Sequence, residues 1–175
     1  MKHIKTILLI IALIAVIGLA IYGYIVLNRE EEQNGGEYGT ERALRPAEEF
    51  TLEDLLGTEI SLSDFRGRKV YLNFWATWCR ACNVMTPYIN EVYLEGHDIE
   101  ILAINIRENN RAIENYMETN NFEFTVLLDS NGRVSNRYRA AAVPHSVLID
   151  EEGNIIDTHT GAMNKQQLME FMRLR

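Results

Sequence analysis

Apolar residues form one long uninterrupted run near the start of this chain. Residues 7–27 hold no charged side chain. As a helix, these 21 residues would be about 31 Å long, enough to cross a hydrocarbon core of about 30 Å. We therefore predict a transmembrane anchor over 7–27, preceded by a short segment over 1–6. A cleavable signal peptide is the alternative, because Gly18-Leu19-Ala20 resembles a small-residue cleavage site. The apolar run continues past that site, however, which favours the anchor.

The pattern of apolar and polar residues changes after the predicted anchor. Residues 28–45 are rich in glutamate and glycine and hold few apolar side chains. Such a composition predicts a flexible acidic linker, which would span roughly 25 Å as a coil. Short apolar segments separated by turns return from about Pro46, and we predict one globular domain over 46–175.

Within that domain, apolar residues alternate between strand spacing and helix spacing. A hairpin over 50–62 comes first, and a second hairpin over 147–158 precedes a final helix capped by Asn164. Between the hairpins we predict three strands, each followed by a helix: strands 69–74, 99–106 and 122–128, and helices 84–93, 111–120 and 134–138. Alternating strands and helices predict an α/β fold, with a central mixed sheet covered by helices.

The composition argues against two classes of function. The chain has 175 residues, a formal net charge of −8 and a pI near 5.0. An acidic chain lacks the basic face that nucleic-acid binding requires, so we expect no nucleic-acid partner. Only two cysteines are present, which disfavours structural zinc because such sites usually take four Cys or His ligands.

Both cysteines lie in the segment Asn73-Phe74-Trp75-Ala76-Thr77-Trp78-Cys79-Arg80-Ala81-Cys82, where a buried strand leads into a helix. This context predicts that Cys79 lies at the helix N-terminus. Unpaired backbone N–H groups and the positive end of the helix dipole favour an anion there. Such a position can lower the pKa of a thiol from ~8.5 into the range ~3.5–7.5, and the thiolate is the reactive form.

The spacing of the two cysteines suits reversible disulfide chemistry. Cys79 would attack a substrate disulfide, and Cys82, on the same helix face, would resolve the mixed disulfide and form a redox-active Cys79–Cys82 bond. Arg80 adds a positive charge beside the thiolate. The alternative is that two buried structural cysteines fall at this spacing by coincidence.

The motif Trp78-Cys79-Arg80-Ala81-Cys82 resembles the active site of the thioredoxin superfamily. Three further positions agree in order: Pro87 matches a proline within the active-site helix, Val143-Pro144 matches the cis-proline loop, and Gly161 matches a family glycine. The resemblance implies that Val143 and Pro144 lie against the cysteines and pair with the substrate backbone. It also implies that Trp78 borders the active-site surface. From the sequence alone, Pro144 could be an ordinary strand-edge proline.

A narrower resemblance covers residues 46–175. The N-terminal hairpin, the strand and helix between residues 99 and 128, and the single anchor resemble the TlpA/ResA-like group of membrane-anchored bacterial thiol–disulfide oxidoreductases. This resemblance implies protein disulfides as substrates, an integral-membrane thiol carrier as electron donor, no cofactor, and for some members a role in cytochrome c maturation.

Flanking charges predict the orientation of the anchor. Lys2 and Lys5 precede the apolar run and Arg29 follows it. The positive-inside rule then leaves the N-terminus in the cytoplasm and the catalytic domain outside the cell membrane.

Two positions depart from the group. Met85 replaces a glutamate that often follows the second cysteine, and such a carboxylate would help take the proton from Cys82. His145 replaces a threonine after the cis-proline. The sequence favours a solvated loop residue at His145; alternatively, His145, like Arg80, tunes the site, or it contacts substrate.

Other functions remain open from the sequence. A Cu(I) chaperone could use Cys79, Cys82 and His145, since thiolate and imidazole both suit copper. A thiol oxidase of the same fold is another possibility, because the residues between the cysteines do not fix the reduction potential. A non-catalytic docking domain is the third, although it would not need the cysteine pair.

Overall fold

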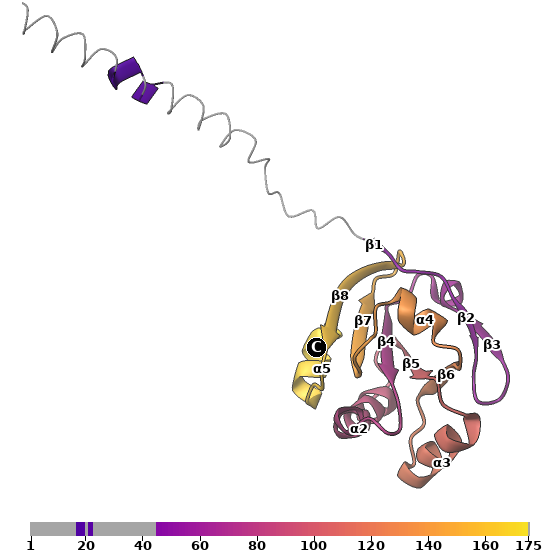
Figure 1. Cartoon of the computed structure of the whole chain (residues 1–175). Coiled ribbons are helices and arrows are strands. Elements are labelled where there is room, and N and C mark those ends of the chain that lie inside the picture. The colour runs from indigo at the N-terminus through magenta and orange to yellow at the C-terminus, as the bar shows by residue number, and fades with distance from the viewer. Residues whose placement is uncertain (1–16, 20, 23–44, 175) are drawn as a thin grey trace, which may run out of the picture. The chain divides into compact units, whose positions relative to one another are not determined.

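The computed structural model describes residues 17–19, 21–22 and 45–174 (Figure 1). Two compact units emerge from the backbone contacts, Met1–Arg42 and Ala43–Arg175. The predicted N-terminal segment, most of the predicted anchor and nearly all of the predicted linker lie outside the described residues. Within the described ranges, no helix is long and apolar enough to cross a membrane.

A six-stranded mixed sheet forms the centre of the second unit, in the order β1-β8-β7-β4-β5-β6. Central strand β4 pairs in parallel with β5 and antiparallel with β7. All six residues of β4 are buried, which explains why its sequence is mostly apolar, with no alternation. The strands of this sheet are β1 Arg45–Pro46, β4 Val70–Trp75, β5 Glu100–Ile106, β6 Thr125–Asp129, β7 His145–Ile149 and β8 Asn154–Thr160.

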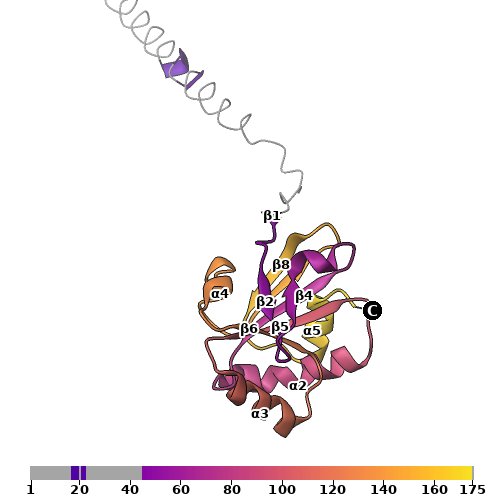
Figure 2. The ribbon, with the colours of Figure 1, turned by 90° about the vertical axis from the view of Figure 1, so that its right-hand side faces the viewer.

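Helices and a hairpin cover the two faces of this sheet. The helices are α2 Arg80–Leu94, α3 Asn110–Asn120, α4 Arg133–Arg137 and α5 Lys165–Phe171. Buried residues of α2, α3 and α5 share one apolar cluster with one face of the sheet. Residues of α4 and of the segment before β4 share a second cluster with the other face. The views in Figures 1 and 2 show α2 and α3 together at one end of the sheet, with α4 apart from them. The predicted α/β fold with a mixed sheet covered by helices is confirmed.

The predicted N-terminal hairpin is also present. Strands β2 (Thr51–Glu53) and β3 (Glu59–Ser61) pair antiparallel. A short 3₁₀ helix, η1 (Leu62–Phe65), follows the hairpin. Ser61 and Asp64 form a capping box there, which stabilises this helical turn.

Several local predictions are confirmed. Asn164 caps α5 by accepting a hydrogen bond from the Gln167 N–H at 2.9 Å. Pro87 lies inside α2, as the resemblance implies. Strand β7 begins at His145, two residues before the predicted start. Strand β1 is only two residues long, too short for any pattern to reveal.

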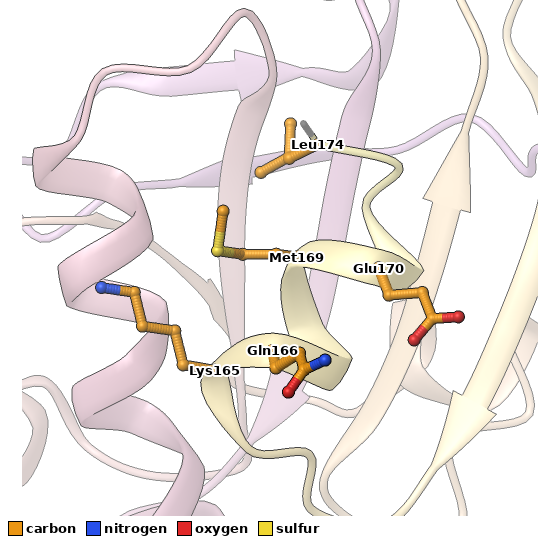
Figure 3. A pocket seen from close by; sticks show the side chains of 5 residues that line it. All are labelled: Lys165, Gln166, Met169, Glu170 and Leu174. Carbon is orange, nitrogen blue, oxygen red and sulfur yellow. The ribbon is translucent and has the colours of Figure 1, made fainter.

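One pocket lies along α5 and shares no lining residue with the cysteine motif (Figure 3). Its lining is Lys165, Gln166, Met169, Glu170 and Leu174. The Lys165 side chain extends toward α2, where its Nζ lies 2.9 Å from Glu91 Oε2 and 2.7 Å from Glu95 Oε1. These ion pairs connect α5 to α2, and they are exposed enough that each contributes little to stability.

Candidate active site

The two cysteines lie at the start of α2 and form a disulfide. Their Cα atoms are 5.2 Å apart. Cys79 is the N-cap residue of α2, with extended backbone angles, and its Sγ accepts the Cys82 backbone N–H at 3.1 Å. The sequence prediction that Cys79 lies at the helix N-terminus is confirmed. An N–H group that already points at Sγ would stabilise a thiolate there after reduction.

The two cysteines differ slightly in exposure to solvent. Both are buried in the apolar cluster beneath the helix, but Cys79 is 6% exposed and Cys82 is 1% exposed. An incoming disulfide would therefore meet Cys79 first. This asymmetry fits the predicted roles of Cys79 as nucleophile and Cys82 as resolving residue.

A proline loop lies against Cys79. The Val143–Pro144 peptide bond is cis, as the resemblance implies. Cys79 Sγ lies 3.5 Å from the Val143 carbonyl oxygen. The Pro144 carbonyl accepts the Gly161 N–H at 2.9 Å, so the family glycine also contacts this loop. The structure thus brings together the cysteines, Val143, Pro144 and Gly161 from three separate parts of the sequence.

The residues beside the cysteines face solvent. Trp78 is 72% exposed, and Arg80 is exposed on the first turn of α2. Trp75, by contrast, is buried in the core against Tyr116 and Phe124. An exposed indole next to the disulfide is available to a partner protein, which is the position predicted for Trp78.

A buried polar group lies on the α2 side of β4 and β7. The Tyr71 hydroxyl is 2.8 Å from Ser146 Oγ, and Asn73 Nδ2 donates to that hydroxyl at 3.4 Å. Burial raises the pKa of Tyr71 far above its usual value, although its hydrogen bonds to Ser146 and Asn73 act in the opposite direction. Tyr71 is therefore neutral, and the group holds no fixed charge beneath the helix.

Met85 is fully buried one turn after Cys82. Its sulfur accepts the Met163 N–H at 3.3 Å. The thioether therefore satisfies a buried backbone donor but cannot take a proton at neutral pH. This position holds no general base for Cys82.

The structure does not bring together the three residues of the alternative Cu(I) site. Along β7, His145 shares a sheet face with Val147, in the cluster packed under α4, whereas both cysteines belong to the cluster on the other face. The His145 ring contacts Phe74 at a centroid distance of 6.1 Å, and its Nδ1 is 2.8 Å from Thr160 Oγ1. No group of three or more His, Cys, Asp or Glu residues that could bind a metal ion occurs in the part of the chain that the structure describes. Strand alternation decides this, because one step along a strand reverses the face.

His145 is nevertheless a candidate for pH sensitivity. Burial lowers its pKa below the ordinary value of 6.5, and His159 acts in the same direction. The unfolded chain therefore binds a proton at a pH where the folded chain does not. We expect the free energy of unfolding to fall as the pH drops below about 6.5.

The measurement is thermal unfolding of the wild type and of His145→Gln between about pH 7.5 and pH 5.5. His145→Gln should lose less stability than the wild type across this range. His97→Gln is the matched control, because His97 is paired with Glu95 at the surface. An equal loss in the wild type and in His145→Gln would contradict the assignment.

One group at the site was not predicted from the sequence. Glu108, in the loop after β5, accepts hydrogen bonds from the Thr77 N–H at 2.7 Å and from Asn105 Nδ2 at 2.8 Å. Thr77 lies two residues before Cys79, whereas Glu108 lies 31 positions from Thr77 in the sequence. A single acid in a polar loop gives no periodic signal, so only the fold could reveal this contact.

Comparison with known proteins identifies the family. Residues 44–158, which cover most of the domain, match the AhpC/TSA family. The chain belongs to this family. It is 33% identical over 168 residues to the thiol-disulfide oxidoreductase ResA of Bacillus subtilis, covering 95% of this chain and 89% of that protein. It is 35% identical over 162 residues to ResA of Geobacillus kaustophilus, covering 91% and 88% of the two chains.

Solved structures agree with these relatives. StoA from Bacillus subtilis superposes with a TM-score of 0.64 at 28% identity, covering 71% of this chain and 96% of that one. A thiol:disulfide interchange protein DsbE from Chlorobium tepidum gives a TM-score of 0.65 at 28% identity, with 74% and 96% covered. The domain therefore has the thioredoxin-like fold, and the chain is a ResA-like thiol–disulfide oxidoreductase.

Proposed function

We propose that this protein reduces disulfides in partner proteins by dithiol–disulfide exchange at Cys79 and Cys82. The observation that carries the proposal is the sulfur pair at the start of α2, with Cys79, the more exposed residue of the pair, against the Val143 carbonyl. The Cys79 thiolate attacks one sulfur of the substrate disulfide, and the other substrate sulfur leaves as a thiolate. Cys82 then attacks Cys79 Sγ, which releases the reduced substrate and leaves the Cys79–Cys82 disulfide.

The cycle needs an electron donor. Each turnover leaves the enzyme oxidised, so a dithiol must reduce the Cys79–Cys82 bond again. We propose that an integral-membrane thiol carrier does so outside the cytoplasm, where the environment is oxidising. Cytochrome c maturation is the pathway we propose, and the resemblance to the TlpA/ResA-like group is what supports it.

We further propose that residues 7–27 anchor the protein in the cell membrane, with residues 46–175 on the outer side. The uncharged apolar run supports this proposal, together with the exposure of Ile17, Leu19, Ile21 and Tyr22 among the described residues. Membrane fractionation and the intact mass of the extracted protein test it. A mass lacking the first 20 or so residues would instead support signal-peptide cleavage.

The direction of electron flow is tested by equilibrating the full chain with glutathione buffers. We expect a reduction potential nearer the −270 mV typical of thioredoxin than the roughly −120 mV of a strong oxidant such as DsbA. The reduced protein should then reduce the disulfides of insulin. A potential near −120 mV, with oxidation of dithiol peptides, would instead support a thiol oxidase.

A further inference from the structure

A single carboxylate holds the turn that leads into the active-site helix. Glu108 Oε2 accepts the Thr77 N–H and Asn105 Nδ2, and Glu108 Oε1 accepts the Thr77 hydroxyl. We propose that Glu108 is a positioning residue for thiol–disulfide exchange, and that it fixes this turn so that Cys79 stays at the N-terminus of α2. The inference rests on the proposed exchange reaction.

The turn itself has four residues, Ala76 to Cys79. The Cys79 N–H donates to the Ala76 carbonyl at 3.2 Å, which closes the turn and leaves Thr77 and Trp78 at its two central positions. Glu108 binds the backbone and the side chain of the first central residue. The next residues along the chain are the exposed Trp78 and then Cys79. A displacement of Thr77 would therefore also displace the sulfur of Cys79.

A second contact holds the other side of Thr77. Its carbonyl oxygen accepts Asn83 Nδ2 at 3.2 Å, and Asn83 Oδ1 in turn accepts the Tyr116 hydroxyl at 3.0 Å. Asn83 belongs to α2 and Tyr116 to α3. All the polar groups of Thr77 are thus bonded, and Glu108 supplies the partner for two of the three.

The backbone around Glu108 is shaped for this contact. Arg107 has a φ of +57°, a left-handed conformation that is unfavourable for a residue with a Cβ. Its N–H donates to the Asp129 carbonyl at 3.2 Å, which holds the strained residue beside the end of β6. Strained residues persist where their surroundings determine them, and they gather at functional sites. Here the strain comes immediately before the carboxylate that reaches Thr77.

Asn105 is also oriented by Glu108. Its amide nitrogen donates to the carboxylate, while its buried Oδ1 has no hydrogen-bond partner among the residues that the structure describes. Asn105 lies opposite Trp75 in the β4–β5 pairing, just before the turn. An unpaired buried oxygen costs free energy. The Asn105 amide nevertheless keeps this orientation, which indicates that its bond to Glu108 determines the orientation.

The position of Cys79 Sγ affects the rate of exchange, because the attacking, central and leaving sulfurs must lie in line. A displacement of a reacting atom by about 1 Å can cost up to about 100-fold in rate. Cys79 Sγ accepts the Cys82 N–H in the observed turn. Without Glu108, both the direction of attack and the stabilisation of the thiolate would weaken. The hydrogen bonds of Glu108 go to Thr77 and Asn105, so the proposed role is exerted through the turn.

Three substitutions of Glu108 distinguish the effect of its side-chain length from the effect of its negative charge. Glu108→Ala removes the contact, and Glu108→Asp keeps the charge but shortens the side chain by one methylene. Glu108→Gln removes the charge and keeps the geometry. Its amide oxygen can accept both N–H groups, and its NH₂ can donate to the Thr77 hydroxyl, which accepts as well as donates. Glu114→Ala is the matched control, because Glu114 is an exposed acid on neighbouring α3.

The experiment uses the full chain and measures the rate constant for attack on a small aromatic disulfide, together with the pH dependence of Cys79 alkylation. We expect Glu108→Ala and Glu108→Asp to be about 10-fold slower than the wild type at pH 7, with the alkylation midpoint moved to higher pH. Glu108→Gln and Glu114→Ala should match the wild type within about twofold.

Two results would overturn the inference: Glu108→Ala as fast as Glu114→Ala, or Glu108→Gln as slow as Glu108→Ala. The second result would mean that the charge is what matters. If Glu108→Ala does not fold, the comparison of Glu108→Asp with Glu108→Gln decides alone. An inactive wild type would count against the proposed function instead, and the alkylation profiles would still test the positioning role.

Discussion

Cys79→Ala is expected to abolish disulfide reduction by this protein. Only two cysteines occur in the chain, and Cys79 is the more exposed of them and has a backbone N–H directed at its sulfur. The remaining thiol, Cys82, lies buried beneath the first turn of α2 and cannot reach a protein disulfide. Insulin reduction by the full chain, with excess dithiol as electron source, should fall to the uncatalysed background.

Cys82→Ala should behave differently. Cys79 can still attack, but nothing resolves the mixed disulfide, so the substrate stays covalently attached. Mass spectrometry after incubation with a disulfide-bonded peptide should show one adduct per chain, removed by dithiothreitol. Leu94→Ala is a suitable control, because Leu94 is exposed at the far end of the same helix. An adduct on Cys79→Ala rather than on Cys82→Ala would reverse the two roles.

Phe74→Ala is expected to cause the largest loss of stability. Phe74 lies in central strand β4, is 0% exposed, and packs against Tyr138 and His145. Removing a buried phenyl ring loses its transfer free energy and leaves a cavity, which typically costs about 3–5 kcal/mol. That is a large part of the roughly 5–15 kcal/mol that stabilises a domain of this size. Urea unfolding followed by circular dichroism measures the change.

The control for Phe74→Ala is Leu56→Ala in the turn between β2 and β3. Leu56 is 91% exposed, so its truncation should change the free energy of unfolding by less than about 0.5 kcal/mol. Comparable losses in the two variants would mean that Phe74 is not part of a close-packed core. A reduced slope against urea in Phe74→Ala alone would indicate a change in the unfolded or folded state beyond a simple cavity.

Much of the fold was predictable because its elements carry local signals. The apolar run before Cys79 predicted a buried strand, and β4 is buried on both faces. The first β-hairpin, the cap at Asn164 and the proline inside α2 were predicted from turn residues, a polar cap and family motifs, and all three are present. Each of these signals lies within a few residues of the element that it predicts, which is why sequence alone could reveal it.

Errors arose where the outcome depended on residues far apart in the chain. His145 follows the proline loop directly, and closeness in sequence to that loop suggested a place beside the cysteines. The pairing of β7 with β4 instead directs its ring to the other face, against Phe74. The bond between Glu108 and Thr77 likewise requires the parallel pairing of β4 with β5, since the two residues follow the ends of those strands.

The sequence by itself determined the chemistry of this protein: two thiols one helical turn apart, at a junction between strand and helix that favours a thiolate. Tertiary structure decided which groups surround them. Sulfur spacing and helix capping depend on neighbouring residues and are set by local backbone geometry. The identity of the side chains that face Cys79 and Thr77 depends on strand order and register, which form only when the whole sheet assembles.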